Sequence, residues 1–202
     1  MLLTYHRESV ARLDPLTLYG ILRLRLDVFV VEQAAAYPDL DGRDVEDGAE
    51  LHWAADGPEV VATLRVLRDP DGALRVGRVA TAARVRSHGV ASGLMRRALE
   101  RCVELDARAP VVLDAQAHLA DWYARFGFVV DGAGFEEDGI PHVPMRRAPL
   151  TGLSATPARP RPGVGPTGVD PGSAPETLDA PEGGQLVGEH VCALSPEHRV
   201  EE

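Results

Sequence analysis

A short run of small and basic residues has the composition of a loop that binds a phosphate group. Its members are Arg86, Ser87, His88, Gly89, Val90 and Ala91. The first backbone N–H groups of a helix have no partner within the helix, and the helix dipole places roughly half a positive charge there. Gly89 and Ala91 carry little or no side chain, so the backbone can approach a bulky anion closely. The segment predicts a pyrophosphate-binding loop at the start of a helix.

Such a loop needs a strand before it and a helix after it. An apolar strand is expected over residues 76–82, and the following helix places four apolar side chains on one face: Leu94, Ala98, Cys102 and Leu105. Five arginines are expected to surround the loop with positive charge: Arg84, Arg86, Arg96, Arg97 and Arg101. A second glycine pattern, at residues 163–168, matches GxGxxG but lies among prolines with no expected strand before it, so we assign it no binding role.

Composition limits the classes of function. The net charge of −10 disfavours nucleic-acid and anionic-membrane binding, since both reward a basic surface. All 21 basic residues are arginine, which excludes a Walker A loop because that loop requires lysine. Cys102 and Cys192 form no CxxC pair and no histidines have zinc-ligand spacing, so neither a metal site nor a disulfide framework is expected. No apolar run approaches about 18 residues, and a soluble cytoplasmic protein is expected.

Two regions of different composition divide the chain. Residues 1–147 have the mixed pattern of an α/β domain, whereas residues 148–202 contain nine prolines and eight glycines and are expected to form a disordered tail. Besides the strand that ends at Thr81, strands are expected over residues 2–6, 51–55, 60–68, 111–113, 128–130 and 142–147. A first helix is expected from an Asp14 N-cap to about Val31, and a short helix over residues 118–126. The first helix carries on one side Leu18, Leu22, Leu26 and Phe29.

Several motifs resemble one family. Arg/Gln-x-x-Gly-x-Gly/Ala after a strand is the acetyl-CoA pyrophosphate motif of the GNAT N-acetyltransferases, and residues 86–91 resemble it. Five further segments are similar to the ElaA family within that superfamily: residues 28–33, 37–44, 115–118, 123–128 and 137–142. The resemblance covers residues 1–147. It implies the GNAT acyl-CoA N-acyltransferase fold, an α/β fold whose mixed central sheet contains two splayed parallel strands and is flanked by helices.

The resemblance also implies a site. Acetyl-CoA would be the co-substrate, with its pyrophosphate on residues 86–91 and its pantetheine and acetyl group against the backbone of Val79, Ala80 and Thr81. Tyr123, four residues before Gly127, would act as the general acid that protonates the departing thiolate. His142 is our candidate general base because it can titrate near neutral pH. Four other residues share that candidacy: Glu32, His118, Glu137 and Asp138.

The implied activity is transfer of an acetyl group from acetyl-CoA to a small-molecule or peptide amine by direct attack, without a metal. Two alternatives stay open: an acyltransferase like the acyl-homoserine-lactone synthases, indicated by residues 29–33 and the long acidic loop, and a CoA-binding sensor whose proline-rich tail docks a partner. The acidic loop at residues 37–50 is interpreted as solvated, with attraction of a cationic amine as the second interpretation.

Overall fold

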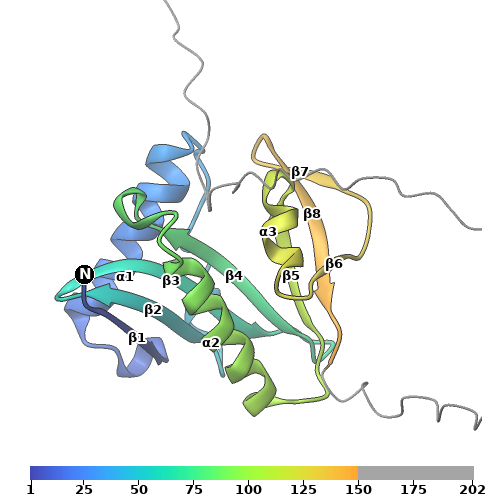
Figure 1. Ribbon diagram of the computed structural model, residues 1–202, viewed down its shortest axis with the longest axis horizontal. Helices are drawn as coiled ribbons and strands as arrows, with labels where there is room; N and C mark the ends of the chain where they lie inside the picture. Colours follow the sequence, from blue (N-terminus) through green and yellow to red (C-terminus); the bar gives the residue numbers. More distant parts are fainter. Residues whose placement is uncertain (150–202) are drawn as a thin grey trace, which may run out of the picture.

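A mixed β-sheet forms the centre of the computed structural model, which describes residues 1–149 (Figure 1). The strand order is β1-β2-β3-β4-β5-β8-β6, and β7 pairs with β8 beside β6. The strands are β1 (Leu3–Glu8), β2 (Glu50–Asp56), β3 (Glu59–Arg68), β4 (Leu74–Thr81), β5 (Val111–Gln116), β6 (Val129–Val130), β7 (Phe135–Glu137) and β8 (Ile140–Arg147). Apart from its first two residues, the tail expected at 148–202 lies outside the described residues.

The helices form where the sequence predicts them. They are α1 (Pro15–Leu26), which a π-helix (Asp27–Glu32) extends, α2 (Val90–Leu105) and α3 (Ala120–Ala124). Asp14 caps α1, because its side chain accepts hydrogen bonds from the N–H groups of Leu16 and Thr17, each at 3.0 Å. Short 3-10 turns occur at Val10–Arg12, Arg43–Val45, Ala83–Val85 and Ala117–Leu119. Strand β7 is an addition to the predicted elements.

The sheet has an apolar core on each face. Neighbouring residues Val60 and Val61 of β3 belong to different buried clusters, as expected when successive side chains of a strand point to opposite faces. The cluster containing Val60 packs α1 against the sheet, and the cluster containing Val61 packs α2. The face predicted for α2 is confirmed at Leu94, Ala98 and Cys102, which are buried.

The buried side of the first helix matches the predicted one in part, since Leu18 and Phe29 pack against the buried cluster but Leu26 does not. Ile21, Leu24, Arg25 and Val28 are buried, whereas Leu26 is 39% exposed. Apolar residues occur on every side of this helix, so their spacing alone does not select a face. The choice follows from Arg25, which has carboxylate partners on the inner side.

Strands β4 and β5 are parallel but pair over only two residues. The aligned positions are Leu74 with Val111 and Arg75 with Val112, after which the strands diverge (Figure 1). Strand β4 continues to Thr81 and β5 to Gln116. The predicted pair of splayed parallel strands is therefore confirmed, and we call the space between them the β4–β5 opening.

A β-bulge lies in β4 beside this opening. Thr63 of β3 is aligned with Ala80, and Arg65 with Gly77, so β4 contains one residue more than β3 over this stretch. Arg78 lies within it at φ +53°, a left-handed conformation that is uncommon for residues other than glycine. Bulges redirect backbone and side chains out of the regular ladder, and they are common beside active sites.

The acidic loop is held to the protein core by a buried arginine. The Arg25 side chain is fully buried, and its Nε donates to Asp39 Oδ2 at 2.8 Å and its Nη1 to Asp44 Oδ1 at 2.7 Å. Asp39 is 2% and Asp44 is 9% exposed. The interpretation of this loop as solvated is therefore wrong for these two aspartates, because α1 supplies their counter-charge from a distant part of the chain.

Replacing Arg25 with leucine should lower the free energy of unfolding by roughly 3 kcal/mol or more, because two buried carboxylates would lose their partner. Urea denaturation of the full chain measures this loss. Arg7→Leu is the control, because Arg7 pairs with Glu104 at an exposed position, where a loss below about 1 kcal/mol is expected. Equal losses in the two variants would contradict the structural role of Arg25.

Candidate functional site

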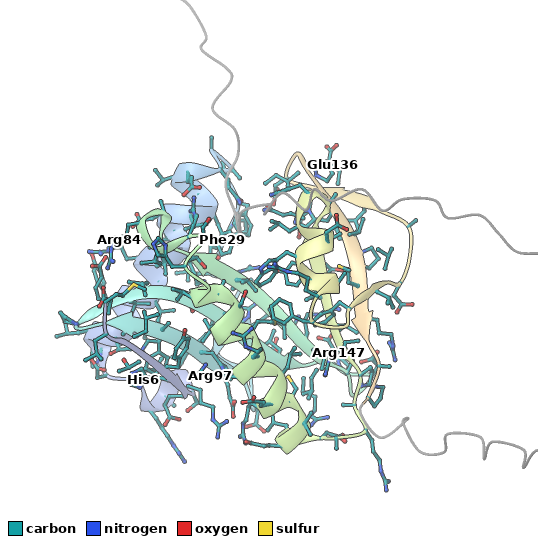
Figure 2. All side chains as sticks on the ribbon, viewed as in Figure 1. His6, Phe29, Arg84, Arg97, Glu136 and Arg147 are labelled. Atoms are coloured by element: carbon teal, nitrogen blue, oxygen red, sulfur yellow. The ribbon has the colours of Figure 1, made fainter. Side chains whose placement is uncertain are left out.

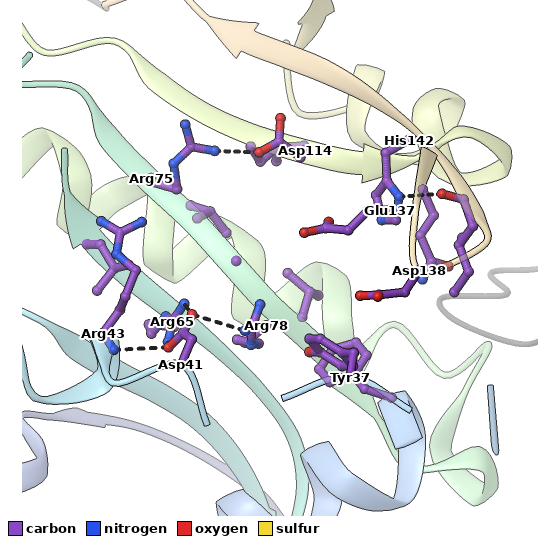
Figure 3. A pocket seen from close by; sticks show the side chains of 18 of the residues that line it. Tyr37, Asp41, Arg43, Arg65, Arg75, Arg78, Asp114, Glu137, Asp138 and His142 are labelled. Atoms are coloured by element: carbon purple, nitrogen blue, oxygen red, sulfur yellow. Dashed lines mark hydrogen bonds and ion pairs between the residues drawn. The ribbon is translucent and has the colours of Figure 1, made fainter. Parts of the chain in front are cut away.

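A cavity of about 760 Å³ lies at the β4–β5 opening (Figure 3). We call it the first cavity. Its lining residues come from the bulge of β4, from β5, from α3, from the π-helix and from the β7–β8 hairpin. Phe29 of the π-helix and Glu136 of β7 lie on the two sides of the opening (Figure 2). The first cavity is thus enclosed by segments that are far apart in the sequence.

The end of β4 brings one of its three predicted residues to the first cavity. Val79, directly after the bulge residue Arg78, lines the cavity. The side chains of Ala80 and Thr81 are buried, and Ala80 packs against α1. Strand alternation allows those two side chains to stay in the core while the backbone follows the edge of the opening.

Residues 86–91 form the start of α2, as predicted. Ser87 and Gly89 have φ values of +64° and +74°, and Gly89 is the N-cap of α2. The Gly93 N–H donates to the Gly89 carbonyl at 2.9 Å, so helical bonding begins there. His88 Nδ1 donates to the Arg86 carbonyl at 2.7 Å and fixes the loop. The N–H groups of the first turn therefore lie at the N-terminus of α2, where the helix dipole favours anions.

Most of the arginines around this loop already bind carboxylates. Arg86 contacts both carboxylate oxygens of Glu32, at 2.7 and 2.6 Å, and its Nε donates to the Thr81 carbonyl at 3.0 Å. Arg84 and Arg101 are also paired with acidic residues, and the Arg97 guanidinium lies over the Tyr5 ring, 3.9 Å from its centroid. The expectation of positive charge around the loop is therefore wrong for Arg84, Arg86 and Arg101, because carboxylate partners neutralise these three.

A second cavity, of about 740 Å³, lies along α2, with lining residues from Gly89 to Val103. Its charged lining residues are Arg96, Arg125, Arg147 and a single acid, Glu100. Gly89 and Ser92 reach it from the start of α2. Sequence reasoning missed Arg125 and Arg147, because nothing in the local sequence shows that α3 and β8 approach α2. The lining of the second cavity thus contains three arginines and one acid.

Tyr123 and His142 both line the first cavity. Tyr123 is 6% exposed, and its ring meets Phe128 edge-on with centroids 6.1 Å apart. His142 Nδ1 donates to the Ile140 carbonyl at 2.8 Å, and its ring stacks on Phe135. Because Nδ1 carries the hydrogen in this contact, a neutral His142 ring has its lone pair on Nε2. The structure brings together the two side chains that the sequence proposes for proton transfer.

The other base candidates fall into three groups. Glu137 and Asp138 line the first cavity, whereas Glu32 is bound by Arg86. His118 lies outside the lining of either cavity, and burial together with the nearby His142 lowers its pKa below the ordinary value. Three of the candidate bases therefore lie at the first cavity: His142, Glu137 and Asp138.

Alternating charges form an ion-pair network at one side of the first cavity. Arg65, Arg78 and Asp41 line the cavity, and Asp39, Asp44 and Arg25 continue the network outside the lining. We call this group the arginine–aspartate wall, and its members are Arg25, Arg65, Arg78, Asp39, Asp41 and Asp44. Arg65 contacts Asp41 through two hydrogen bonds of 2.7 Å, and Arg78 contacts Asp39 at 2.9 Å and Asp41 at 3.0 Å. The Tyr37 hydroxyl donates to Asp39 at 2.8 Å, and burial raises the pKa of this phenol. Sequence analysis found the acids of this wall but none of the arginines that bind them.

Two further findings concern absences. Among residues 1–149, no cluster of three or more histidine, cysteine, aspartate or glutamate side chains has the arrangement of a metal site. Within the same residues, no helix combines the length and apolar character needed to cross a membrane.

Comparison with known proteins identifies relatives. The sequence model of the GNAT acetyltransferase domain matches residues 12–149. A UPF0039 protein from Mycobacterium tuberculosis is 44% identical over 140 residues, which cover 67% of this chain and 86% of that protein. Protein ElaA from Escherichia coli is 42% identical over 134 residues, which cover 64% of this chain and 86% of ElaA.

Solved structures give the same result. The crystal structure of Escherichia coli ElaA superposes with a TM-score of 0.69 at 36% identity, covering 72% of this chain and 99% of that one. An acyl-CoA N-acyltransferase from Pseudomonas aeruginosa also gives a TM-score of 0.69, at 39% identity, covering 73% of this chain and all of the other. The resemblance to ElaA drawn from the sequence is confirmed.

The arginine–aspartate wall should make stability depend on acid. Burial raises the pKa of Asp41, but hydrogen bonds from Arg65 and from the Arg43 N–H outweigh it and hold this pKa well below its ordinary value. Asp41 therefore stays ionised in the folded protein at pH values where the same side chain is protonated in the unfolded chain, below about pH 4. The stabilisation from its ion pairs is present at neutral pH and is lost as the pH falls below about 4. Urea denaturation between pH 7 and pH 2 should show a shallower acid loss in Asp41→Asn than in the wild type.

The control is Asp47→Asn, an exposed acid of the same loop that has no ion pair within residues 1–149. This variant should follow the wild-type acid profile. Parallel profiles for all three proteins would show that Asp41 is not a source of the acid sensitivity.

Proposed function

Because this chain belongs to the GNAT acetyltransferase family, and is an acyltransferase, we propose that it transfers the acetyl group of acetyl-CoA to an amine by direct attack. One observation carries the proposal. Strands β4 and β5 part after two paired positions, and the opening has Val79 and Tyr123 on its sides and a helix N-terminus close to the end of β4.

The residues around α2 fit the phosphate-bearing part of the donor. Gly89 takes the left-handed conformation that a residue with a side chain adopts only with strain, and it opens the helix whose first N–H groups attract anions. Arg96, Arg125 and Arg147 line the second cavity next to it. We assign the pyrophosphate to residues 86–91, mainly through backbone N–H groups because Glu32 binds the Arg86 side chain. The backbone of Val79, Ala80 and Thr81 is assigned to the pantetheine and acetyl group.

The thioester of acetyl-CoA supplies an acyl group that is already activated, so the protein must place it and manage charge and protons. A backbone N–H in the bulged part of β4, next to Val79, is the proposed donor to the thioester oxygen. Such donors contribute roughly 3 kcal/mol to the stabilisation of developing negative charge. Tyr123 is the proposed general acid, donating its hydroxyl proton to the departing sulfur. His142 Nε2 is the proposed base, accepting a proton from the attacking ammonium.

Placing a carboxylate on the loop should weaken donor binding. Calorimetric titration of the full chain with acetyl-CoA should give a Kd in the micromolar range, and Gly89→Glu should weaken binding by roughly tenfold or more, because it sets negative charge and bulk against the pyrophosphate. The matched control is Gly48→Glu in the acidic loop, where Gly48 also has a positive φ, +77°, with open space around a new side chain. Unchanged binding in Gly89→Glu would remove the pyrophosphate from this loop.

Removing the Tyr123 hydroxyl should slow the reaction without changing the affinity for acetyl-CoA. With the amine that the wild type uses best, Tyr123→Phe should reduce kcat by about 100-fold or more while the Kd for acetyl-CoA stays the same, because the ring packing is kept and only the proton is lost. Release of the CoA thiol measures turnover. Tyr19→Phe, at a residue 67% exposed on α1, is the control and should keep the wild-type kcat. A wild-type kcat in Tyr123→Phe would assign the proton to another group.

A further inference from the structure

We propose that the acceptor is a dicationic alkyl amine, and that its second positive charge binds at Glu137 and Asp138 while its first amine accepts the acetyl group. This inference rests on the proposed function and names the substrate class of the same site. It replaces the acidic loop by the β7–β8 hairpin as the part of the protein that attracts the acceptor.

The arginines of the first cavity do not offer a site for an anionic acceptor. Four of them line it: Arg43, Arg65, Arg75 and Arg78. Each is bound by at least one carboxylate; Arg75, for example, donates to Asp69 and Asp114, both at 2.7 Å. A carboxylate on the acceptor could reach one of these guanidiniums only by displacing an ion pair that is already formed. Positive charge on this side of the cavity is therefore balanced by the protein itself.

Negative charge on the opposite side is not balanced. Glu137 and Asp138 point into the first cavity from the β7–β8 hairpin, across from Arg78 (Figure 3). Within residues 1–149, neither carboxylate is paired with a basic side chain. Two carboxylates that face the cavity therefore keep their charge available to a cation from solution.

A tight turn carries these two carboxylates, both of which are exposed to solvent. Asp138 and Gly139 form its two-residue turn with φ values of +49° and +79°, the two positive φ values of a type I′ turn. The aligned pairs Phe135–His142 and Glu137–Ile140 connect the two strands next to the turn. The geometry of the hairpin thus links the position of Glu137 to that of His142, our proposed base.

The first cavity also has apolar lining residues that can contact an alkyl chain. Phe29, Leu113, Leu119 and Ile140 all line the first cavity. The attacking amine must be neutral when it reacts, so it cannot neutralise Glu137 and Asp138 during the reaction. A second ammonium group at the other end of the chain stays protonated and can do so. The charge and the apolar lining together match a diamine better than a simple amine or an amino acid.

Three amines of one chain length test the proposal with the full-length protein and acetyl-CoA. The probes are 1,5-diaminopentane, pentylamine and 5-aminopentanoate, which share the reactive amine and differ only in a positive, absent or negative distal charge. The diamine should have a kcat/KM at least tenfold above pentylamine, and 5-aminopentanoate should be the poorest. An equal rate for diamine and pentylamine, or a preference for 5-aminopentanoate, would overturn the proposal.

Variants of the hairpin locate the charge. Glu137→Gln combined with Asp138→Asn should raise the KM for 1,5-diaminopentane by about tenfold and leave kcat/KM for pentylamine within about twofold, a pattern that loss of a general base would not give because both amines must lose a proton. The matched control is Glu136→Gln, an exposed acid on the same hairpin outside the cavity lining, which should change neither constant. Equal losses for both amines in the double variant would refute a distal-charge site.

Binding separates this inference from the proposed function. Calorimetric titration of the wild type with 1,5-diaminopentane, in the presence of CoA, should show binding that the double variant loses and Glu136→Gln keeps. This result supports the cation site even if no probe is acetylated, whereas absence of binding at millimolar diamine overturns it. Failure of the proposed function would appear separately, as a wild type that binds no acetyl-CoA.

Discussion

A buried guanidinium must meet a carboxylate, and this requirement organises the region around the β4–β5 opening. Asp39 accepts hydrogen bonds from both Arg25 of α1 and Arg78 of the β4 bulge. A single carboxylate therefore joins the first helix, the acidic loop and the strand that borders the opening. Because isolated charges are costly to bury, none of these three segments can move independently without separating a charge from its partner. This network therefore helps to determine the shape of the first cavity.

The same network explains how β4 tolerates a non-glycine residue in a left-handed conformation. A strained backbone persists when its surroundings determine it fully. The Arg78 guanidinium bonds two aspartates and lies over the Tyr37 ring, 5.2 Å from its centroid. These contacts hold the residue whose bulge releases β4 from its regular ladder where β5 turns away. Backbone groups that would otherwise pair with a neighbouring strand become available at the opening.

The parts of the fold that depend on local sequence could be predicted, and the parts that depend on distant partners could not. Residues 86–91 and helix α2 follow from glycine placement and apolar spacing, and both are found where expected. The buried side of α1 followed only in part, because its selection depends on aspartates more than ten residues later in the chain. Likewise, no local signal shows that Glu32 binds Arg86 or that Arg125 and Arg147 line a cavity beside α2.

Tyr123 and His142 illustrate an intermediate case. Tyr123 was proposed from the resemblance to a family and His142 from its residue type and position. The structure places both at the first cavity, but their catalytic roles stay predictions. The hairpin of Glu137 and Asp138 was visible as a set of base candidates, although β7 itself was not predicted. Its place opposite Arg78 becomes visible only when the strands are assembled.

The two cavities share no lining residue, and one lies along α2 while the other lies at the arginine–aspartate wall. If donor and acceptor occupy them as proposed, neither blocks the entry of the other. A ternary complex can then form before any bond breaks, and the acetyl group passes directly from donor to acceptor at the β4–β5 opening. The kinetic order of such an enzyme is sequential, and the parting of two β-strands is its structural origin.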